Sequence, residues 1–199
     1  INYLSTQFPT DHSFYLRSAY GSNSAFDIHS YWSDTSEGNF GRVGILAEIY
    51  YRQTDGYRTI DAGNGYGGSD KTGFDLMEPM VKIFWEPNSD VYQRWEFKYG
   101  YTEFNADETY AGLTESDLKA NPYRRYAGTF LDHMATEHKR SYLKYLVEPA
   151  DNLTLQVAAY YNEFERDWYK INKAGGQSVS KVVADPITYA AAYDDLRLL

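Results

Sequence analysis

Residues 152–166 carry the clearest alternation of hydrophobic and polar positions in the chain. One set of alternate positions is mostly apolar and consists of Leu153, Leu155, Val157, Ala159 and Tyr161. The other set is more polar and consists of Thr154, Gln156, Ala158, Tyr160, Asn162, Phe164 and Arg166. A period of two is typical of a β-strand with two different faces. The run exceeds the roughly 5–6 residues of an average soluble strand and fits the about 9–11 residues of a tilted strand that crosses a bilayer. We therefore expect a transmembrane strand with lipid on one side and a wet interior on the other.

The same alternation recurs along most of the chain. It predicts further long strands at 14–22, 26–33, 40–53, 77–85, 94–102 and 139–147, and a short strand at 1–8 that ends before Pro9. Pro79 lies inside one of these segments, where a proline removes a ladder hydrogen bond, so we expect a bulge there. The pattern predicts an all-β, antiparallel fold.

The connections between these segments alternate in length. Short turns are expected at 36–39, 87–90 and 148–152, and long loops at 54–73, 105–134 and from 167 onward. Outer-membrane barrels show this asymmetry, with tight turns on one side of the membrane and long loops on the other. Two loop segments are predicted to be helical: 114–120, with Thr114 as N-cap, and 185–198, with Pro186 at the first helical position.

Composition narrows the possible functions. The 199 residues have a net charge of −9 and a pI near 4.9, which argues against nucleic acid as a partner. There is no cysteine, so thiolate chemistry is excluded. Aromatic residues make up 18% of the chain, including 21 tyrosines. Such a content fits the aromatic girdles of membrane barrels, and it also fits a soluble, tyrosine-rich β-sandwich that binds carbohydrate.

Short motifs give little support to catalysis. The segment Gly63–Gly68 matches G-x-G-x-x-G, but it lies in a polar loop without the strand and helix that a dinucleotide site requires. His133, Glu137 and His138 do not have the spacing of a zinc protease. Asn152 to Thr154 form a glycosylation sequon that we interpret as a turn. We expect no enzyme activity, no resident metal and no organic cofactor.

Charged residues on the polar faces are the remaining candidates for chemistry. They are Arg42, Glu48, Arg52, Arg94, Glu96, Lys98, Arg140, Lys144 and Arg166. A water-filled interior with balanced charges explains most of them. A site for an anionic ligand is the alternative, because guanidinium groups pair well with carboxylates. Arg166 is the best candidate, since it ends its strand before a long loop and lies next to Trp168 in sequence.

Several segments resemble TonB-dependent outer-membrane receptors of the ferric-citrate type. The resemblance is carried by Glu108–Leu118, Asn121–Tyr126 (with the pattern N-P-Y-x-R) and Tyr160–Lys170 (with F-x-R-x-W), and also by Gln53–Arg58 and Ile1–Thr6. It extends to about residue 173.

The resemblance implies a fold and a function. It implies a 22-stranded barrel closed by an amino-terminal plug, located in the outer membrane of a Gram-negative bacterium. Residues 1–10 would be the end of the plug, and 11–199 the first part of the barrel. Such receptors take up iron chelates with energy delivered by the TonB complex through the plug, and lie among lipid and lipopolysaccharide. Arg166 matches a ligand-contacting arginine of the family; Trp168, Arg124 and Arg125 are further ligand-binding candidates.

The chain also departs from the family. Seven strands are fewer than the minimum of eight, and most of the plug is absent, so we expect the chain to be a piece of a longer receptor. Two alternatives stay open: the soluble β-sandwich, and a small self-contained barrel with a structural or adhesive role. The small barrel would need an eighth strand within 1–12 or 177–199.

Overall fold

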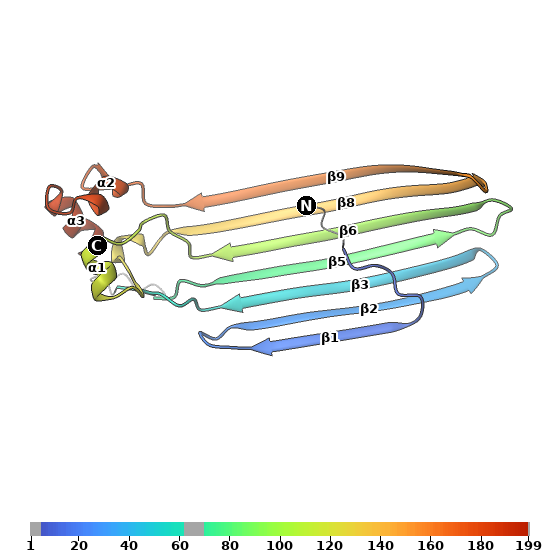
Figure 1. Cartoon of the computed structure of the whole chain (residues 1–199), viewed down its shortest axis with the longest axis horizontal. Coiled ribbons are helices and arrows are strands. Elements are labelled where there is room, and N and C mark those ends of the chain that lie inside the picture. Colours follow the sequence, from blue (N-terminus) through green and yellow to red (C-terminus); the bar gives the residue numbers. More distant parts are fainter. Residues whose placement is uncertain (1–4, 62–69, 199) are drawn as a thin grey trace.

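A computed structural model describes residues 5–61 and 70–198. Strands make up 57% of it. Seven long strands dominate: β1 (Ser13–Tyr20), β2 (Phe26–Gly38), β3 (Gly41–Thr54), β5 (Phe74–Glu86), β6 (Tyr92–Ala106), β8 (His133–Ala150) and β9 (Leu153–Tyr169). They form one antiparallel sheet in the order β1-β2-β3-β5-β6-β8-β9 (Figure 1). The predicted antiparallel all-β organisation is confirmed. Within the described residues, β1 and β9 are the two edges, and no helix is long and apolar enough to cross a membrane.

The two ends of the sheet differ as the loop lengths predict. Three tight turns, β2–β3, β5–β6 and β8–β9, lie together at one end, and the long connections with their helices lie at the other (Figure 1). At the end of the sheet that carries the helices, here called the helical end, several strands extend beyond their predicted bounds. For example, β8 begins at His133 rather than near residue 139, and β6 continues to Ala106.

One face of the sheet, here called the outer face, carries an apolar band. Its large side chains come from every long strand and are exposed: Phe14, Leu16, Trp32, Val43, Ile49, Ile83, Trp85, Trp95, Phe97, Tyr99, Leu143, Leu155, Val157 and Tyr161. The strand registers place these positions on the same side of the sheet. Between Trp95 and Tyr101 of β6 the band spans roughly 20 Å at about 3.4 Å per residue. Glu103, Glu137 and Glu163 follow it toward the helical end.

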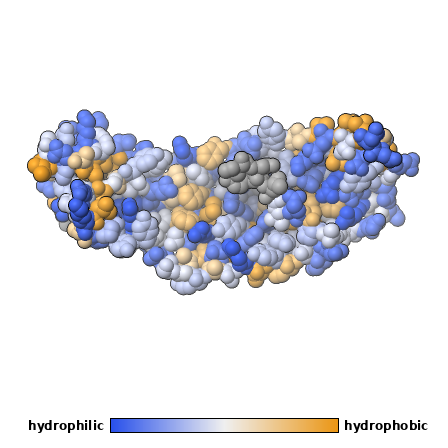
Figure 2. All heavy atoms as spheres, in the orientation of Figure 1, coloured by the Kyte–Doolittle hydropathy of each residue, from blue (hydrophilic) through white to orange (hydrophobic). Residues whose placement is uncertain are grey.

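The opposite, inner face is polar, and residues 5–12 of the chain cross it. Figure 1 shows this amino-terminal segment running over the sheet to the start of β1, and Figure 2 shows the same face, on which hydrophilic colours predominate and hydrophobic ones form separate patches. Beneath the segment lie the buried side chains of Leu46 and Phe84. The Phe84 ring rests on Gly44, where an added Cβ would come within 2.1 Å of a ring carbon, so this position needs glycine.

The loops at the helical end pack into a small unit with its own core. We call residues 107–132 and 170–198 the loop cap. It contains α1 (Glu115–Ala120), η1 (Ala127–Thr129), α2 (Val179–Ala184), α3 (Ala190–Leu198) and the hairpin β10 (Lys173–Ala174) with β11 (Gln177–Ser178). Its buried core is Ala111, Tyr126, Ala174, Val179, Val182, Ala192 and Leu196. A parallel bridge between β4 (Thr59–Ile60) and β7 (Arg124–Arg125) joins the loop after β3 to the cap.

Some local predictions are confirmed and others are wrong. Helix α1 has the predicted N-cap, with the Thr114 side chain accepting a hydrogen bond from the Asp117 amide. The helix predicted at 185–198 begins only at Ala190, so Pro186 is not its first residue. Residues 5–8 are not a strand; 1–4 lie outside the described residues.

The bulge expected at Pro79 is also wrong. Pro79 lies in the central strand β5, opposite Ile49 of β3, and the register between β5 and β6 is the same on both sides of it. The proline is accommodated because Glu78 and Pro79 form no pairs with β6, while the register of the two strands stays the same before and after them. An irregularity occurs instead near the β8–β9 turn, between Val147 and Ala150.

Candidate functional site

Arg166 and Trp168 lie near the end of β9, on the inner face, where the sheet meets the loop cap. The Arg166 guanidinium is 5.5 Å from the centre of the Trp168 ring, and the Tyr110 ring centre is 4.5 Å from that of Trp168. The Lys170 ammonium lies 4.1 Å from the centre of the Tyr110 ring and 4.6 Å from that of Trp168. We call these four residues the rim cluster. Two cations and two aromatic rings from β9, its exit and the 107–132 loop are therefore brought together.

The rim cluster has unused binding capacity. Neither Arg166 nor Lys170 forms an ion pair with any described residue. The indole N–H of Trp168 is buried and has no acceptor among the described residues. Chemically, the cluster offers an anion two cations that have no ion-pair partner among the described residues.

Arg124, in contrast, is committed to partners inside the protein. Its Nε and Nη2 donate to Asp61 at 3.0 and 2.6 Å, and Nη1 donates to Asp117 at 2.9 Å. These partners, first the hydrogen bonds to Asp61, raise the pKa of Arg124 above its ordinary value. The side chain therefore ties the loop after β3 to helix α1.

Arg125 is buried and also serves the loop structure. Its Nε donates to the Thr129 hydroxyl at 2.7 Å, and its Nη2 donates to the Thr129 carbonyl at 2.5 Å, while Nη1 bonds the Asp107 carbonyl. Burial lowers the pKa of this guanidinium. With 3% of its surface exposed, Arg125 has no free face for a ligand in this arrangement.

Asp117 is the polar centre of the loop cap. The Tyr126 hydroxyl donates to Asp117 Oδ2 at 2.7 Å, and the Tyr193 hydroxyl of α3 donates to the same oxygen. Burial opposes ionisation of this carboxyl, but the hydrogen bonds from Tyr193 and Tyr126 and the Arg124 charge outweigh it and lower its pKa. Burial and the bond to Asp117 raise the pKa of Tyr126. One carboxylate thus links three separate segments.

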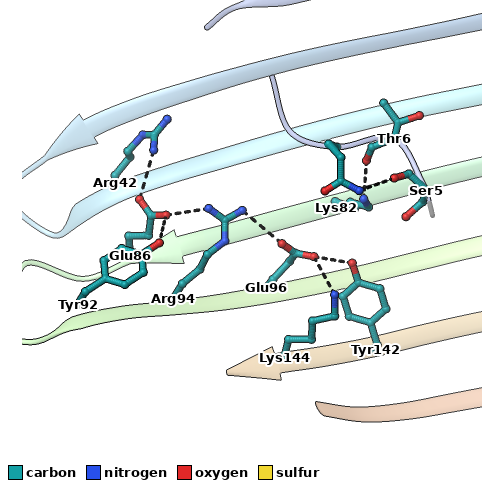
Figure 3. A network of polar contacts seen from close by, with 11 residues as sticks. Ser5, Thr6, Arg42, Lys82, Glu86, Tyr92, Arg94, Glu96, Tyr142 and Lys144 are labelled. Atoms are coloured by element: carbon teal, nitrogen blue, oxygen red, sulfur yellow. Dashed lines mark hydrogen bonds and ion pairs between the residues drawn. The ribbon is translucent and has the colours of Figure 1, made fainter. Parts of the chain in front are cut away.

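The inner face of the sheet carries a continuous chain of ion pairs (Figure 3). Arg42 and Arg94 contact Glu86 at 3.4 and 2.7 Å, and Arg94 also contacts Glu96 at 3.3 Å. Glu96 then accepts a hydrogen bond from the Tyr142 hydroxyl at 2.5 Å and lies 3.8 Å from Lys144. The polar-face prediction included Arg42, Arg94, Glu96 and Lys144. It missed Glu86 of β5 and Tyr142 of β8, which lie on the same inner face as these residues.

The amino-terminal segment is held by this face. Lys82, which is 3% exposed, donates to the Thr6 carbonyl at 2.5 Å, and the Thr6 hydroxyl donates to Glu48 at 2.7 Å. The Phe8 ring packs edge-on against Phe84 with centroids 4.8 Å apart. Sequence analysis did not single out Lys82, whose role depends on a residue 76 positions away.

The remaining motifs form no site in the described residues. The Gly63–Gly68 motif lies outside them. His133 begins β8 and is 3.2 Å from Asp107, and no group of histidine and acidic side chains suitable for a metal ion occurs in 5–61 or 70–198. Comparisons of the chain with known protein families, with curated proteins and with solved structures found no match.

Proposed function

We propose that the chain is part of a TonB-dependent receptor in the outer membrane of a Gram-negative bacterium, which takes up an iron chelate of the ferric-citrate type. The seven strands would belong to a 22-stranded barrel, with the outer face against lipid and lipopolysaccharide and the inner face lining the lumen. Residues 1–10 would be the end of the plug, through which the TonB complex acts. The protein would transport its ligand without catalysis or a resident cofactor.

The apolar band on the outer face is the observation that carries this proposal. Water-soluble proteins rarely expose a contiguous apolar patch of more than a few hundred Å². Here large apolar side chains form a band across all seven strands of one face, and tryptophan and tyrosine lie toward its margins (Trp85 and Trp95 at the turn end, Tyr99 and Tyr161 at the other). A bilayer with a hydrocarbon core of about 30 Å is a natural occupant of such a band.

Two further observations support a lumen on the other face. The ion pairs of Figure 3 are on the side that residues 5–12 cross, which is where a plug would lie. The unpaired edges β1 and β9 also fit a sheet that continues in a longer chain, since unpaired backbone groups cost several kcal/mol each in lipid.

The alternatives from the sequence are less well supported. A β-sandwich needs two sheets packed face to face, whereas the seven long strands form a single sheet. A self-contained barrel needs an eighth long strand, and none occurs in 5–12 or 177–198.

Transport by the full-length protein from its source tests the proposal. Its intact mass should be three- to fourfold the 23.0 kDa of this chain. In a Gram-negative host without its own ferric-citrate receptor, it should support uptake of radiolabelled ferric citrate only when TonB is present. A native mass near 23.0 kDa, or full solubility without detergent, would contradict the proposal.

Arg166→Ala tests the rim cluster within that receptor. Loss of a charged hydrogen bond should weaken binding of a carboxylate-bearing iron chelate by about 1.5–3 kcal/mol, measured by titration calorimetry. Lys139→Ala is the control, because Lys139 faces the outer side of β8 and pairs with Glu163 at 2.8 Å. Unchanged affinity in Arg166→Ala would remove the rim cluster from the ligand site.

A further inference from the structure

Four cations converge on one region of the inner face. Lys98 of β6 lies directly opposite Lys82 of β5 and opposite Tyr142 of β8. Arg140 and Lys144 are two residues to either side of Tyr142, so both are diagonal neighbours of Lys98. We call Lys82, Lys98, Arg140 and Lys144 the cation cluster. It lies on the sheet, away from the rim cluster at the end of β9.

This arrangement conflicts with ordinary sheet stability. Like charges directly opposite each other in an antiparallel pair are destabilising, and Lys82 and Lys98 are such a pair. Both lysines are withdrawn from solvent, with Lys82 3% exposed and Lys98 half-buried. Local conflicts of this kind are concentrated at functional sites in natural proteins.

The carboxylates nearby do not balance the cluster. Glu96 is shared among Arg94, Tyr142 and Lys144, and Lys144 is the most distant of the three at 3.8 Å. Among the described residues, the Lys82 ammonium donates to the Thr6 carbonyl, lies 5.9 Å from the centre of the Phe8 ring and forms no ion pair. Lys98 makes no hydrogen bond or ion pair with any described residue; its ammonium lies 5.8 Å from the centre of the Tyr142 ring.

Arg140 is also incompletely satisfied. Its Nη2 contacts Thr102 and lies 3.7 Å from Glu78, which is a loose ion pair. Its Nε is buried and has no acceptor among the described residues. A guanidinium with an unused N–H beside an unpaired ammonium is a ready donor set for an oxyanion.

A hollow of about 310 Å³ opens over these groups. It is lined by all four members of the cation cluster and a single carboxylate, Glu96. The rest of its lining is neutral and consists of Ser5, Gln7, Ser141, Tyr142, Tyr160 and Asn162. The lining of the hollow therefore combines four cations and one carboxylate with neutral hydrogen-bonding groups, while Glu48 and Glu78 line an adjoining hollow that shares Lys98 and Arg140 with it.

We infer that this hollow is a second anion-binding site, which takes a small anion carrying two or more carboxylates. Neighbouring strands are about 4.8 Å apart and alternate residues on one strand about 7 Å apart, so the cations are spread over a patch rather than focused on one point. Such a spread matches several carboxylates on one molecule better than a single charge. The role of the bound anion rests on the proposed function, in which the hollow is an intermediate binding site inside the lumen, below the rim cluster. Anion binding itself does not depend on transport.

The test uses the purified full-length protein in detergent and iron-free citrate as the probe. Lys98→Gln should weaken citrate binding tenfold or more, measured by titration calorimetry at low salt. The same variant should raise the melting temperature of the citrate-free protein, because it removes the like-charge pair with Lys82. Lys139→Gln, on the outer face of β8, should change neither quantity.

Opposite changes in affinity and melting temperature distinguish a ligand site from a structural one. If a carboxylate of the protein fills the hollow, Lys98→Gln will lower the melting temperature and leave citrate affinity unchanged, and the inference is then wrong. Lys144→Gln provides a second variant, and it should weaken citrate binding in the same direction as Lys98→Gln.

The failure of this inference can be separated from failure of the proposed function. Loss of citrate binding in Arg166→Ala with none in Lys98→Gln would overturn the second site and leave the receptor proposal standing. Loss in Lys98→Gln together with absence of TonB-dependent uptake would support the second site and overturn the receptor proposal.

Discussion

The loop cap and the seven-stranded sheet stabilise themselves in different ways. The cap encloses its own apolar core around Tyr126, Val182 and Leu196, each no more than 1% exposed. Its central carboxylate, Asp117, is hydrogen-bonded by Tyr126 and Tyr193. The sheet instead leaves the aromatic and aliphatic side chains of its outer face exposed, and its buried residues lie mainly beneath the segment 5–12.

This difference indicates whether the stability of each region depends on residues within it or on the medium around it. The cap has a buried apolar core of its own, so its stability should respond strongly to substitutions within that core. The sheet has one face with an exposed apolar band and, within the described residues, two edges without a partner strand. Regional stability measurements, such as hydrogen exchange followed by mass spectrometry, can compare the two in one sample.

The largest effect is expected for Tyr126→Ala. Truncating a buried aromatic side chain costs about 3–5 kcal/mol, and this change also removes the hydroxyl that contacts Asp117 and the Thr114 amide. Hydrogen exchange should accelerate throughout 107–132 and 170–198 and stay unchanged in β3, β5 and β6. Tyr123→Ala, at a 62% exposed site of the same loop, is the control. Accelerated exchange in the central strands would show that cap and sheet unfold together.

A pair of phenylalanines compares the two faces of the sheet. Phe84 is 1% exposed under Phe8, whereas Phe97 on the neighbouring strand is 42% exposed on the outer face. Phe84→Ala should cost about 3–5 kcal/mol and make residues 5–12 sensitive to protease. Phe97→Ala should cost about 1 kcal/mol in detergent, because its ring is only partly buried by the protein. Equal losses of stability in the two variants would mean that the two faces of the sheet do not differ in how far they are buried by the protein.

Asp117→Asn should weaken the cap by about 1.5–3 kcal/mol, the range for hydrogen bonds to a charged group. The native pKa of Asp117 is lowered, so its contribution is present above the ordinary aspartate pKa of about 3.9 and is lost as pH falls through the lowered value. Exchange rates in the cap, corrected for intrinsic rates, should therefore rise on acidification in the native chain. In the variant this acid-dependent step should be absent.

Asp132 affects the pH dependence of cap stability in the opposite direction, and it therefore serves as an internal control in the acidification experiment. Burial raises its pKa, so its ionisation disfavours the folded cap as pH rises from the ordinary value to the raised one. This contribution should persist in Asp117→Asn. A variant in which both steps disappear would indicate that the cap had unfolded.

Thr114→Ala should have the smallest effect, about 1 kcal/mol, because it removes the N-cap hydrogen bond from the Asp117 amide together with a contact to the Ser116 hydroxyl. The loss should be confined to α1 and be visible as faster exchange of its first-turn amides. Thr114→Ser keeps the hydroxyl and should restore most of the stability. If serine fails to do so, packing of the threonine methyl group rather than capping is responsible.

The strands were predictable from the sequence because alternation is a local signal. In β9 the apolar positions Leu155 and Val157 indicate both the strand and its exposed face. Strands were predicted too short where both of their faces become polar. The extension of β8 over His133–His138 is an example, since its residues carry no hydrophobic alternation although Met134 to His138 pair with β6.

The helices show where local signals fail. The capping residues of α1 marked it correctly. Helix α2 was missed, because its valines favour strands; Val179 and Val182 are helical here because their spacing of three lets both enter the core of the cap.

The candidate site was predictable only in part. Arg166 and Trp168 do lie together at the end of a strand, as their sequence positions suggested. Arg124 and Arg125 were further candidates from the resemblance alone, and they bind partners within the protein, including Asp61, which lies 63 residues before Arg124 in the sequence. Contacts at such separations depend on the tertiary fold and leave no trace in the spacing of residues.

The unequal edges of the sheet have a practical consequence for anyone who produces this chain alone. The edge strand β9 has 17 residues and β1 has 8, and each offers a row of free backbone donors and acceptors. Other copies can add to these rows, so recombinant material of this chain should polymerise edge to edge. Inclusion bodies rather than monomers are the expected product, and the longer β9 edge should template most of the growth.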